Sequence, residues 1–431
     1  MLDFLVLGIA TWLGVFEPSK NELQPLEALS WEQSALFELP EFERDHLSAG
    51  VVESYLQTLA SRGFEGERQG IWIQSEWDIS ARNRGLTPLP AASLTKIATT
   101  LATLSQWGAA HEFVTDVYLT GKLENGVVTG DIVIQGNSDP LFVWEEAIAL
   151  GNALSQLGIR EVRGNILVAG EFYMNFKSEP LVAGKLFRQA LDKNLWTAPI
   201  TQQYLQMPPG TKQPEILVTG TVKAIARQPK DTRQLIRHRS LPLAEILRQM
   251  NIYSNNKMAQ MLANSVGGAQ AVAQTSAEIA GIPTAEIKLI NGSGLGEENQ
   301  ISPRAACQML MAIDRLLQEH NYSAADLFPT AGRDVVGTLQ GRGLPRGTSV
   351  KTGTLDSVSA LAGVIPTSDR GNVYFSIINY GGSLKYLRQQ QDRLLNELVQ
   401  PWQLKPSNFD LSPEPKWYLG NPHRNKIGNF N

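Results

Sequence analysis

Two side chains three residues apart, Ser93 and Lys96, have the types and spacing of a nucleophile and its base. A serine hydroxyl becomes an effective nucleophile only when a neighbouring group removes its proton. A lysine can do this when burial or nearby positive charge keeps its amine unprotonated. A helix that begins at Ser93 would place both groups on one face and direct its positive end at a developing oxyanion. The pattern therefore predicts acyl transfer through a serine.

A serine and a lysine at this spacing also occur together by chance, and Ser254 and Lys257 form a second such pair. This second pair is better interpreted as a Ser-x-Asn motif, Ser254 and Asn256, at the start of a helix in a region of helical periodicity at 243–262. The hydroxyl can relay a proton to the leaving group, while the Asn amide can hold the substrate backbone and the base. The alternative is an ordinary helix cap, because Ser and Asn are favoured there.

The third motif is Lys351-Thr352-Gly353, followed by Thr354. On an edge strand, Lys351 and Thr352 can bind a substrate carboxylate. Gly353 would let an extended peptide lie close against the strand. We expect the backbone N–H of Thr354 to be a second oxyanion donor. The alternative is an edge lysine beside a bulge glycine.

The three motifs occur in the order found in serine β-lactamases and penicillin-binding proteins. Over about residues 50–400 the chain resembles the class C (type 4) low-molecular-mass penicillin-binding proteins, which are serine D-alanyl-D-alanine carboxypeptidases and endopeptidases. Besides the three motifs, the segments that resemble the family are Pro-Ala-Ala-Ser-Leu-Thr-Lys at 90–96, Gly-Asn-Ser-Asp-Pro at 136–140, Asn-Gly-Ser-Gly-Leu at 291–295 and Gly-Thr-Leu at 337–339.

The resemblance implies an α+β fold: a β-lactamase/transpeptidase-like domain, discontinuous in sequence and interrupted after the Ser-x-x-Lys helix by a β-rich inserted domain. It implies peptidoglycan stem peptides ending in D-Ala-D-Ala, or D-Ala cross-links, as substrates. Ser93 would form an acyl-enzyme that water releases and that β-lactams trap. Asp139 resembles an acidic turn residue that helps to recognise the stem-peptide side chain.

Two positions depart from the family pattern. Asn291 replaces the usual aspartate of its loop, and Glu297 follows the motif where the family usually carries an arginine. The stem-peptide side-chain preference is therefore open, as is the choice between carboxypeptidase and endopeptidase. Two other classes remain as alternatives: a serine β-lactamase, and a cell-wall scaffold that binds penicillin without turnover.

Periodicity and turn residues outline the elements that must position these motifs. The expected helices lie at 47–62, 93–108, 145–157, 243–262, 303–320 and 384–399, and the expected strands at 70–74, 113–121, 126–128, 130–135, 164–169, 349–354 and 372–379. The expected domains are an apolar leader or buried N-terminal helix at 1–25, a first transpeptidase part at 40–114, a β-rich insertion at 115–235, a second transpeptidase part at 236–403 and a loosely attached polar tail at 404–431.

Composition excludes several other classes. The 431 residues are 42% hydrophobic and 19% charged, with a formal net charge of −4, which gives no reason to expect nucleic acid as a partner. Cys307 is the only cysteine and the five histidines are scattered, so we expect no metal and no cofactor. The apolar run at 4–16 has the length of a signal-peptide core. It favours a periplasmic or cell-envelope location, with membrane association through this segment.

Overall fold

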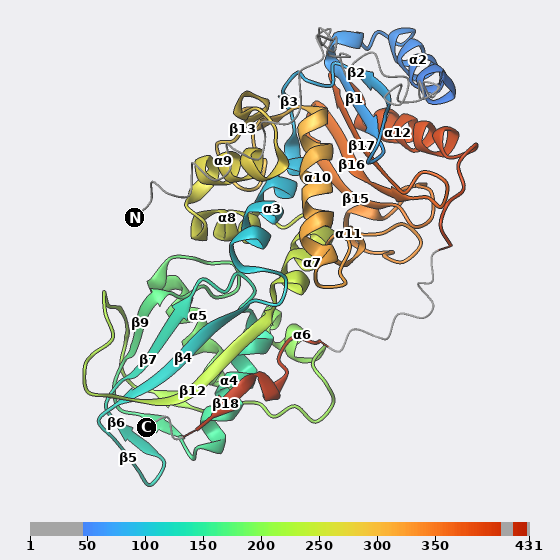
Figure 1. The fold of residues 1–431 in the computed structure, drawn as a ribbon. Helices are drawn as coiled ribbons and strands as arrows, with labels where there is room; N and C mark the ends of the chain where they lie inside the picture. Colours follow the sequence, from blue (N-terminus) through green and yellow to red (C-terminus); the bar gives the residue numbers. More distant parts are fainter. Residues whose placement is uncertain (1–45, 407–416, 429–431) are drawn as a thin grey trace, which may run out of the picture. The chain divides into compact units, whose positions relative to one another are not determined.

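The computed structural model describes residues 46–406 and 417–428, so the predicted leader at 1–25 lies outside the described residues. A five-stranded antiparallel sheet with the order β15-β16-β17-β1-β2 lies at the upper right of Figure 1. The strand bounds are β15 (Ser349–Leu355), β16 (Val358–Pro366), β17 (Asn372–Tyr380), β1 (Gln69–Gln74) and β2 (Ile79–Asn83). Strand β15 lies at the edge, as predicted for the segment that carries Lys351.

Both faces of this sheet are covered by helices, so its central strands β16, β17 and β1 are almost wholly buried. Helices α2 (His46–Ala60) and α12 (Leu384–Leu398) pack on one face, where Ile71 and Ile73 of β1 join their core. Helix α10 (Pro303–Gln318) packs on the other face, where Trp72 lies between those two residues in sequence but points the opposite way.

A group of helices beside α10 completes the part of the fold that holds the predicted motifs. Its members are α3 (Thr95–Trp107), α7 (Leu243–Tyr253), α8 (Asn256–Ser265), α9 (Gly268–Ala280) and α11 (Ala324–Leu327). A small sheet, β13 (Ile287–Lys288), β14 (Gln300–Ile301) and β3 (Leu89–Pro90), connects the 291–299 loop to the chain just before Ser93. Residues far apart in sequence are thereby brought to one place.

The segment between α3 and α7 has a hydrophobic core of its own, which runs from Val117 to Ile236. Its larger sheet has the order β11 (Val222–Ala224), β9 (Ile166–Glu171), β7 (Ile132–Asn137), β4 (Glu112–Thr120), β12 (Thr232–Pro242) and β18 (Asn425–Ile427). A smaller sheet contains β10 (Leu217–Val218), β8 (Glu161–Val162), β6 (Val127–Thr129) and β5 (Lys122–Glu124).

The expectation of a mostly β segment is incomplete, because three helices pack into the same core: α4 (Trp144–Gln156), α5 (Pro180–Leu191) and α6 (Ala198–Tyr204). Periodicity predicts α4, whereas residues 170–229 contain many prolines and isolated glycines and show no clear pattern. Pro180 and Pro199 lie in the first turns of α5 and α6. A proline is favourable there, since the first helical N–H groups have no partner within the helix.

The prediction of a loosely attached tail at 404–431 is wrong for residues 417–428. Strand β18 pairs with β12, and His238 Nδ1 lies 2.8 Å from Asn425 Oδ1. The buried Arg424 forms an ion pair with the buried Glu146 of α4 and donates to the Arg239 carbonyl at 3.1 Å. A polar composition misleads here, because the polar groups are satisfied inside the fold instead of by water.

We expect Arg424→Met to lower the free energy of unfolding by about 3–5 kcal/mol, because it leaves the Glu146 carboxylate buried without its partner. Chemical denaturation followed by tryptophan fluorescence would measure the loss. Arg163→Met is the matched control, since Arg163 pairs with Glu161 in solvent and should change stability little. Equal stabilities for the two variants would show that the buried ion pair contributes no more to stability than the exposed one.

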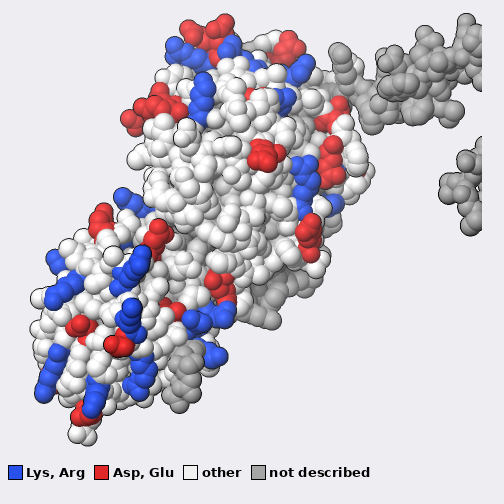
Figure 2. Space-filling view, turned by 60° about the vertical axis from the view of Figure 1, so that its left-hand side comes forward, with Lys and Arg blue, Asp and Glu red and all other residues white. Residues whose placement is uncertain are grey.

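On the face shown in Figure 2, acidic and basic side chains are interspersed. Among residues 46–406 and 417–428, no helix is long and apolar enough to cross a membrane. The apolar run at 4–16, on which the membrane prediction rests, lies outside the described residues.

Candidate active site

Ser93 lies in a tight turn between β3 and α3. The turn is a 3-10 helix, η3 (Ala92–Leu94), and α3 begins only at Thr95, two residues later than expected. Ala92 has a φ of 48°, a left-handed conformation that costs a non-glycine residue about 1 kcal/mol or more. This bend leaves the Ser93 side chain half-buried at the start of the helix.

Lys96 is fully buried, and three oxygen atoms surround its amine. Nζ lies 3.0 Å from Ser93 Oγ, 2.7 Å from Asn256 Oδ1 and 2.7 Å from the Ser293 carbonyl oxygen. The three acceptors come from separate parts of the sequence, so the tertiary fold itself assembles the site. Two of the contacts, to Ser93 and Asn256, join residues that the motifs predicted to act together.

Burial lowers the pKa of Lys96 to about 7. At neutral pH a large fraction of the amine is therefore uncharged, which is the form that can accept a proton. Lys351 is also fully buried, and its pKa lies well below the ordinary value, first because of burial and second because of the charge of Lys96. The charge of Lys96 thus disfavours protonation of Lys351.

Ser254 lies just before α8, so the expected position of this motif at a helix start is confirmed, whereas the helical region expected at 243–262 is divided into two helices, α7 and α8. The φ of 52° at Ser254 ends α7 and lets α8 begin at Asn256 in a new direction. Asn255 caps α8, its Oδ1 accepting from the backbone N–H groups of Lys257 and Met258. Because Asn255 caps the helix, the side chains of Ser254 and Asn256 remain available to the two lysines.

Lys351 connects the edge strand to that helix junction. Its Nζ donates to Ser254 Oγ at 3.0 Å and to the Thr352 carbonyl oxygen at 2.9 Å. The predicted motifs therefore form two contact pairs, Lys96 with Asn256 and Lys351 with Ser254. In each pair, a lysine contacts one of the two residues, Ser254 and Asn256, at the junction of α7 and α8.

Gly353 allows the edge strand to approach the Ser93 turn. A Cβ atom at this position would lie 2.9 Å from the Ala91 carbonyl oxygen and 3.1 Å from Ala92 Cβ. The motif predicts that this space serves a bound peptide, whereas in the structure it allows β15 to lie beside the turn that carries Ser93. Thr354, the next residue, is exposed at the same end of the strand.

The 291–299 loop supplies the Ser293 carbonyl, a site contact that the sequence analysis missed. Asn291 Oδ1 accepts from the backbone N–H groups of Ser293, Gly294 and Leu295, and Asn291 Nδ2 donates to the Leu295 carbonyl at 2.6 Å. Asparagine in place of aspartate is thus fully hydrogen-bonded. The motif at 291–295 indicates that this loop matters. It does not indicate which atom contacts Lys96, because any residue type has a backbone carbonyl.

Gly294 packs against η3, the turn that carries Ser93. It has a φ of 83°, and a Cβ atom would lie 1.8 Å from the Ala92 carbonyl oxygen. We expect Gly294→Ala to displace Ser93 and slow penicillin acylation by about 100-fold, since a misplacement near 1 Å can cost that much. Stopped-flow fluorescence would give the rate.

Gly296→Ala is the matched control for this variant. Gly296 lies in the same loop with a φ of 105°, but the close contact of a Cβ there is with the flexible end of Glu298. We expect it to retain most of the acylation rate. Equal losses in the two variants would mean that strain in the loop, and not contact with the Ser93 turn, slows the reaction.

Asp139 is not brought to this group of residues by any contact in the described parts of the chain. It lies in the turn between β7 and α4, is 4% exposed, and accepts from the Leu141 backbone N–H at 2.9 Å. Burial raises the pKa of Asp139 to about 7. A role in binding the stem peptide stays a prediction, and its burial argues against direct contact in this conformation.

Glu297, the other departure from the family pattern, is exposed beside the edge hairpin. Its carboxylate accepts from Ser357 Oγ at 2.7 Å and from the Tyr380 hydroxyl at 3.1 Å. These contacts hold a negative charge next to the β15–β16 turn. The position thus carries the opposite charge to the usual arginine.

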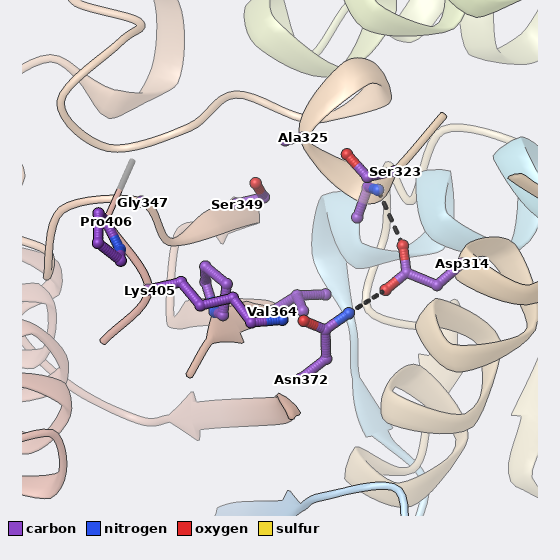
Figure 3. Close-up of a pocket in the computed structure, with 11 residues that line it drawn as sticks. Asp314, Ser323, Ala325, Gly347, Ser349, Val364, Asn372, Lys405 and Pro406 are labelled. Carbon is purple, nitrogen blue, oxygen red and sulfur yellow. Dashed lines mark hydrogen bonds between the residues drawn. The ribbon is translucent and has the colours of Figure 1, made fainter. Parts of the chain in front are cut away.

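A separate cavity of about 280 Å³ lies near the start of β15 and contains none of the predicted site residues (Figure 3). Asp314 faces it, and its carboxylate accepts from the Ala324 backbone N–H at 2.8 Å and from Asn372 Nδ2 at 3.3 Å. Its lining offers no serine–lysine pair in contact. We therefore assign the chemistry to the Ser93 site.

The antiparallel sheet between helices, with a serine and a buried lysine in contact at a helix start, defines the class of penicillin-recognising serine proteins. Comparison with known families agrees: the chain belongs to the D-Ala-D-Ala carboxypeptidase 3 (S13) family, which matches residues 55–180 and 182–398. The sequence-based assignment to the type 4 penicillin-binding proteins is thereby confirmed.

Among curated relatives, a D-alanyl-D-alanine carboxypeptidase of an Actinomadura strain is 32% identical over 223 residues, which are 47% of this chain and 37% of that protein. The chain thus spans little more than a third of that relative's length. D-alanyl-D-alanine carboxypeptidase DacB of Haemophilus influenzae is 23% identical over 398 residues, covering 68% of this chain and 80% of that protein.

Two solved structures show the same fold. Penicillin binding protein 4 of Haemophilus influenzae aligns with a TM-score of 0.60 at 20% identity, covering 80% of this chain and 99% of that one. A penicillin G-acylated predatory endopeptidase of Bdellovibrio bacteriovorus aligns with a TM-score of 0.67 at 21% identity, covering 78% and 93%. These likenesses confirm the predicted α+β, β-lactamase/transpeptidase-like fold.

Proposed function

We propose that this chain is a serine D,D-carboxypeptidase that hydrolyses the D-Ala-D-Ala bond of peptidoglycan stem peptides through an acyl-enzyme on Ser93. The observation that carries the proposal is the contact between Ser93 Oγ and the buried Lys96 amine, 3.0 Å apart, together with a lysine pKa near 7. Membership of a family of D-Ala-D-Ala carboxypeptidases supports the same substrate.

The contacts of Lys96 suggest how it acts as the base. A neutral amine has two N–H groups and one lone pair. Asn256 Oδ1 and the Ser293 carbonyl, each 2.7 Å away, can accept the two N–H groups, which leaves the lone pair directed at the Ser93 hydroxyl. Ser93 then attacks the scissile carbonyl while its proton passes to Lys96.

Completion of the cycle needs a proton for the leaving amine and a water molecule for the ester. Ser254, in contact with Lys351, is placed to relay the proton that Lys96 took from Ser93 to the leaving amine of D-alanine, which returns Lys96 to its uncharged form. Water then attacks the Ser93 ester, Lys96 accepts its proton, and the serine oxygen leaves with a proton to regenerate the hydroxyl. The backbone N–H groups of Ser93 and Thr354 are the proposed donors to the oxyanion.

Substrate binding would use the open side of β15. An edge strand offers unpaired backbone groups to an extended peptide, and Lys351 and Thr352 add polar contacts beside it. A β-lactam would enter the same way and acylate Ser93. Cross-linked stems are the second candidate substrate, because one solved protein of this fold is described as an endopeptidase.

Release of D-alanine from a synthetic pentapeptide ending in D-Ala-D-Ala would test the proposal, with the same peptide ending in D-Ala-L-Ala as the control. We expect release only from the first peptide, and its abolition by prior treatment with benzylpenicillin. A stable penicillin adduct without D-alanine release would favour the scaffold. Rapid consumption of penicillin would favour a β-lactamase.

We also propose a location in the cell envelope, with the apolar run at 4–16 as the segment that associates with the membrane. The proposed substrate lies outside the cytoplasm, which requires export of the enzyme. Fractionation of cells producing the full chain, with and without residues 1–25, would test this. Equal recovery of both forms in the cytoplasmic fraction would refute it.

A further inference from the structure

A trough on the protein surface lies between α10 and the hairpin that joins β1 to β2. It consists of two pockets of about 480 Å³ and about 270 Å³, which adjoin because Glu76 and Trp77 line both. At 1.5 Å per residue, the α10 positions that line it extend over about 21 Å, which is long enough for an oligomer. Five of these positions recur at every third or fourth residue and so share one face of the helix: Arg304, Gln308, Met311, Arg315 and Gln318. We call this feature the α10 trough.

Trp77 projects from the tip of the hairpin where the two pockets meet. It is 78% exposed, which is unusual for so large an apolar side chain. Its backbone is nevertheless held in place, because Ser75 Oγ accepts from the N–H groups of Trp77 at 3.2 Å and Asp78 at 3.1 Å. The hairpin thus presents an aromatic face on which a ligand can stack.

The polar groups of the α10 trough balance in charge. Across the described chain, the guanidinium groups of Arg82 and Arg315 have no hydrogen-bond or ion-pair partner, and neither do the carboxylates of Glu76 and Asp78. Acidic residues on both sides of Trp77 disfavour an anionic lipid surface. Free donors and acceptors without an excess of either charge suit an uncharged ligand that has both hydroxyl and amide groups. The charged residues of the lining are three acids and three arginines: Glu76, Asp78, Asp314, Arg82, Arg304 and Arg315.

The register of the central sheet relates the α10 trough to the Ser93 site. Gly353, which lies against the Ser93 turn, is in the same row of the sheet as Gly70 of β1. The hairpin follows Gln74, four residues further along β1, and β1 lies three strands across from β15. At about 3.3 Å per residue and about 4.8 Å per strand, the separation is about 20 Å. A stem peptide of five residues spans at most about 17 Å, so one stem could connect the two places.

We propose that the α10 trough binds the glycan strand to which the stem peptide is attached, with one sugar ring stacked on Trp77. A sugar ring has an apolar C–H face and a rim of polar groups, which match the indole and the polar walls on either side of it. The proposal rests on the proposed function and deepens it, because it extends the substrate from a peptide to a polymer of uncharged, N-acetylated sugars. The bound strand would hold each stem within reach of Ser93.

Calorimetric titration with the tetramer of N-acetylglucosamine tests the site, because this probe is uncharged and carries no peptide. We expect the tetramer to bind the wild type, and its affinity to fall about 10-fold in Trp77→Ala, a loss typical of stacking on an aromatic side chain. Trp77→Phe should retain part of the affinity, since it keeps an aromatic face. Trp417→Ala is the matched control: Trp417 is 45% exposed but lines neither pocket, so its removal should leave the affinity unchanged.

D-alanine release provides the second readout, measured on intact peptidoglycan and on the synthetic pentapeptide. The ratio of the rate on the polymer to the rate on the pentapeptide should fall about 10-fold in Trp77→Ala and stay at the wild-type value in Trp417→Ala. An unchanged ratio in Trp77→Ala would show that the trough does not bind the strand that carries the stem, and would overturn the proposal.

A wild type that does not bind the tetramer, or a Trp77→Ala variant that binds it equally well, would also overturn the proposal and leave a protein partner as the occupant to examine. Tetramer binding that depends on Trp77, in a wild type that releases no D-alanine, would refute the proposed carboxypeptidase but retain the sugar site. Release from the pentapeptide without tetramer binding would do the reverse.

Discussion

Replacing Ser93 by alanine should leave a folded protein that forms no adduct with benzylpenicillin. Ser93 Oγ is the hydroxyl in contact with the Lys96 amine, and alanine removes the atom that would form the ester. We expect the acylation rate to fall by more than about 10⁴-fold. Intact mass after incubation with the drug would show a single added penicillin in the wild type and none in the variant.

Ser105→Ala is the matched control for that experiment. Ser105 is an exposed serine of the same helix α3, whose hydroxyl bonds only to the Ala102 carbonyl. It should acylate like the wild type. An adduct on Ser93→Ala at the wild-type rate would move the nucleophile elsewhere, with Ser254 as the next serine to examine because it contacts Lys351.

Replacing Lys96 by alanine should slow acylation by about 10²- to 10⁴-fold, the usual contribution of a general base. The pH dependence provides a second readout. Burial lowers the pKa of Lys96 to about 7, and only the uncharged amine can accept the Ser93 proton. The acylation rate of the wild type should therefore rise with pH through about 7 and level off above it, and this step should be lost in the variant.

Lys257→Ala tests which of the two Ser-x-x-Lys pairs, Ser93 with Lys96 or Ser254 with Lys257, supplies the base. Lys257 is exposed on α8, so its removal should leave both the rate and the pH profile unchanged. A loss in Lys257→Ala as large as in Lys96→Ala would mean that burial has identified the wrong lysine. A wild-type profile without a step near pH 7 would exclude Lys96 as the titrating base.

The residue pairs of the site were predictable where the reaction requires particular side chains at both positions. Ser93 with Lys96 is a local pair on one turn, and the Ser-x-Asn and Lys-Thr-Gly motifs identified the partners that the fold brings to it. The edge position of β15 was also predictable, since a strand that binds substrate needs an open side. The family comparison agrees with the order of these motifs.

Other features depend on contacts between distant segments and leave no local pattern. The break at Ser254 occurs inside a continuous helical periodicity, because the apolar spacing of α7 and α8 continues across a left-handed residue. The Ser293 carbonyl carries no side-chain signature.

The C-terminal segment was mispredicted for a related reason. Its polar residues at 417–428 are typical of a solvated tail, yet Arg424 and Asn425 are buried against Glu146 and His238. A buried ion pair is visible only when both partners are known, and these two lie in different parts of the chain. Composition alone therefore favoured the wrong outcome.

The pairing of β18 with β12 has a consequence for biosynthesis. Asn425 follows its partner His238 by 187 residues, so a ribosome would expose the β12 edge of the inserted sheet long before β18 emerges. An uncovered edge strand is a template for pairing with other chains. At an elongation rate of about 5–20 residues per second, the nascent chain must protect this edge for about ten seconds or more, a period in which a chaperone or a slow translocation machinery would have most effect.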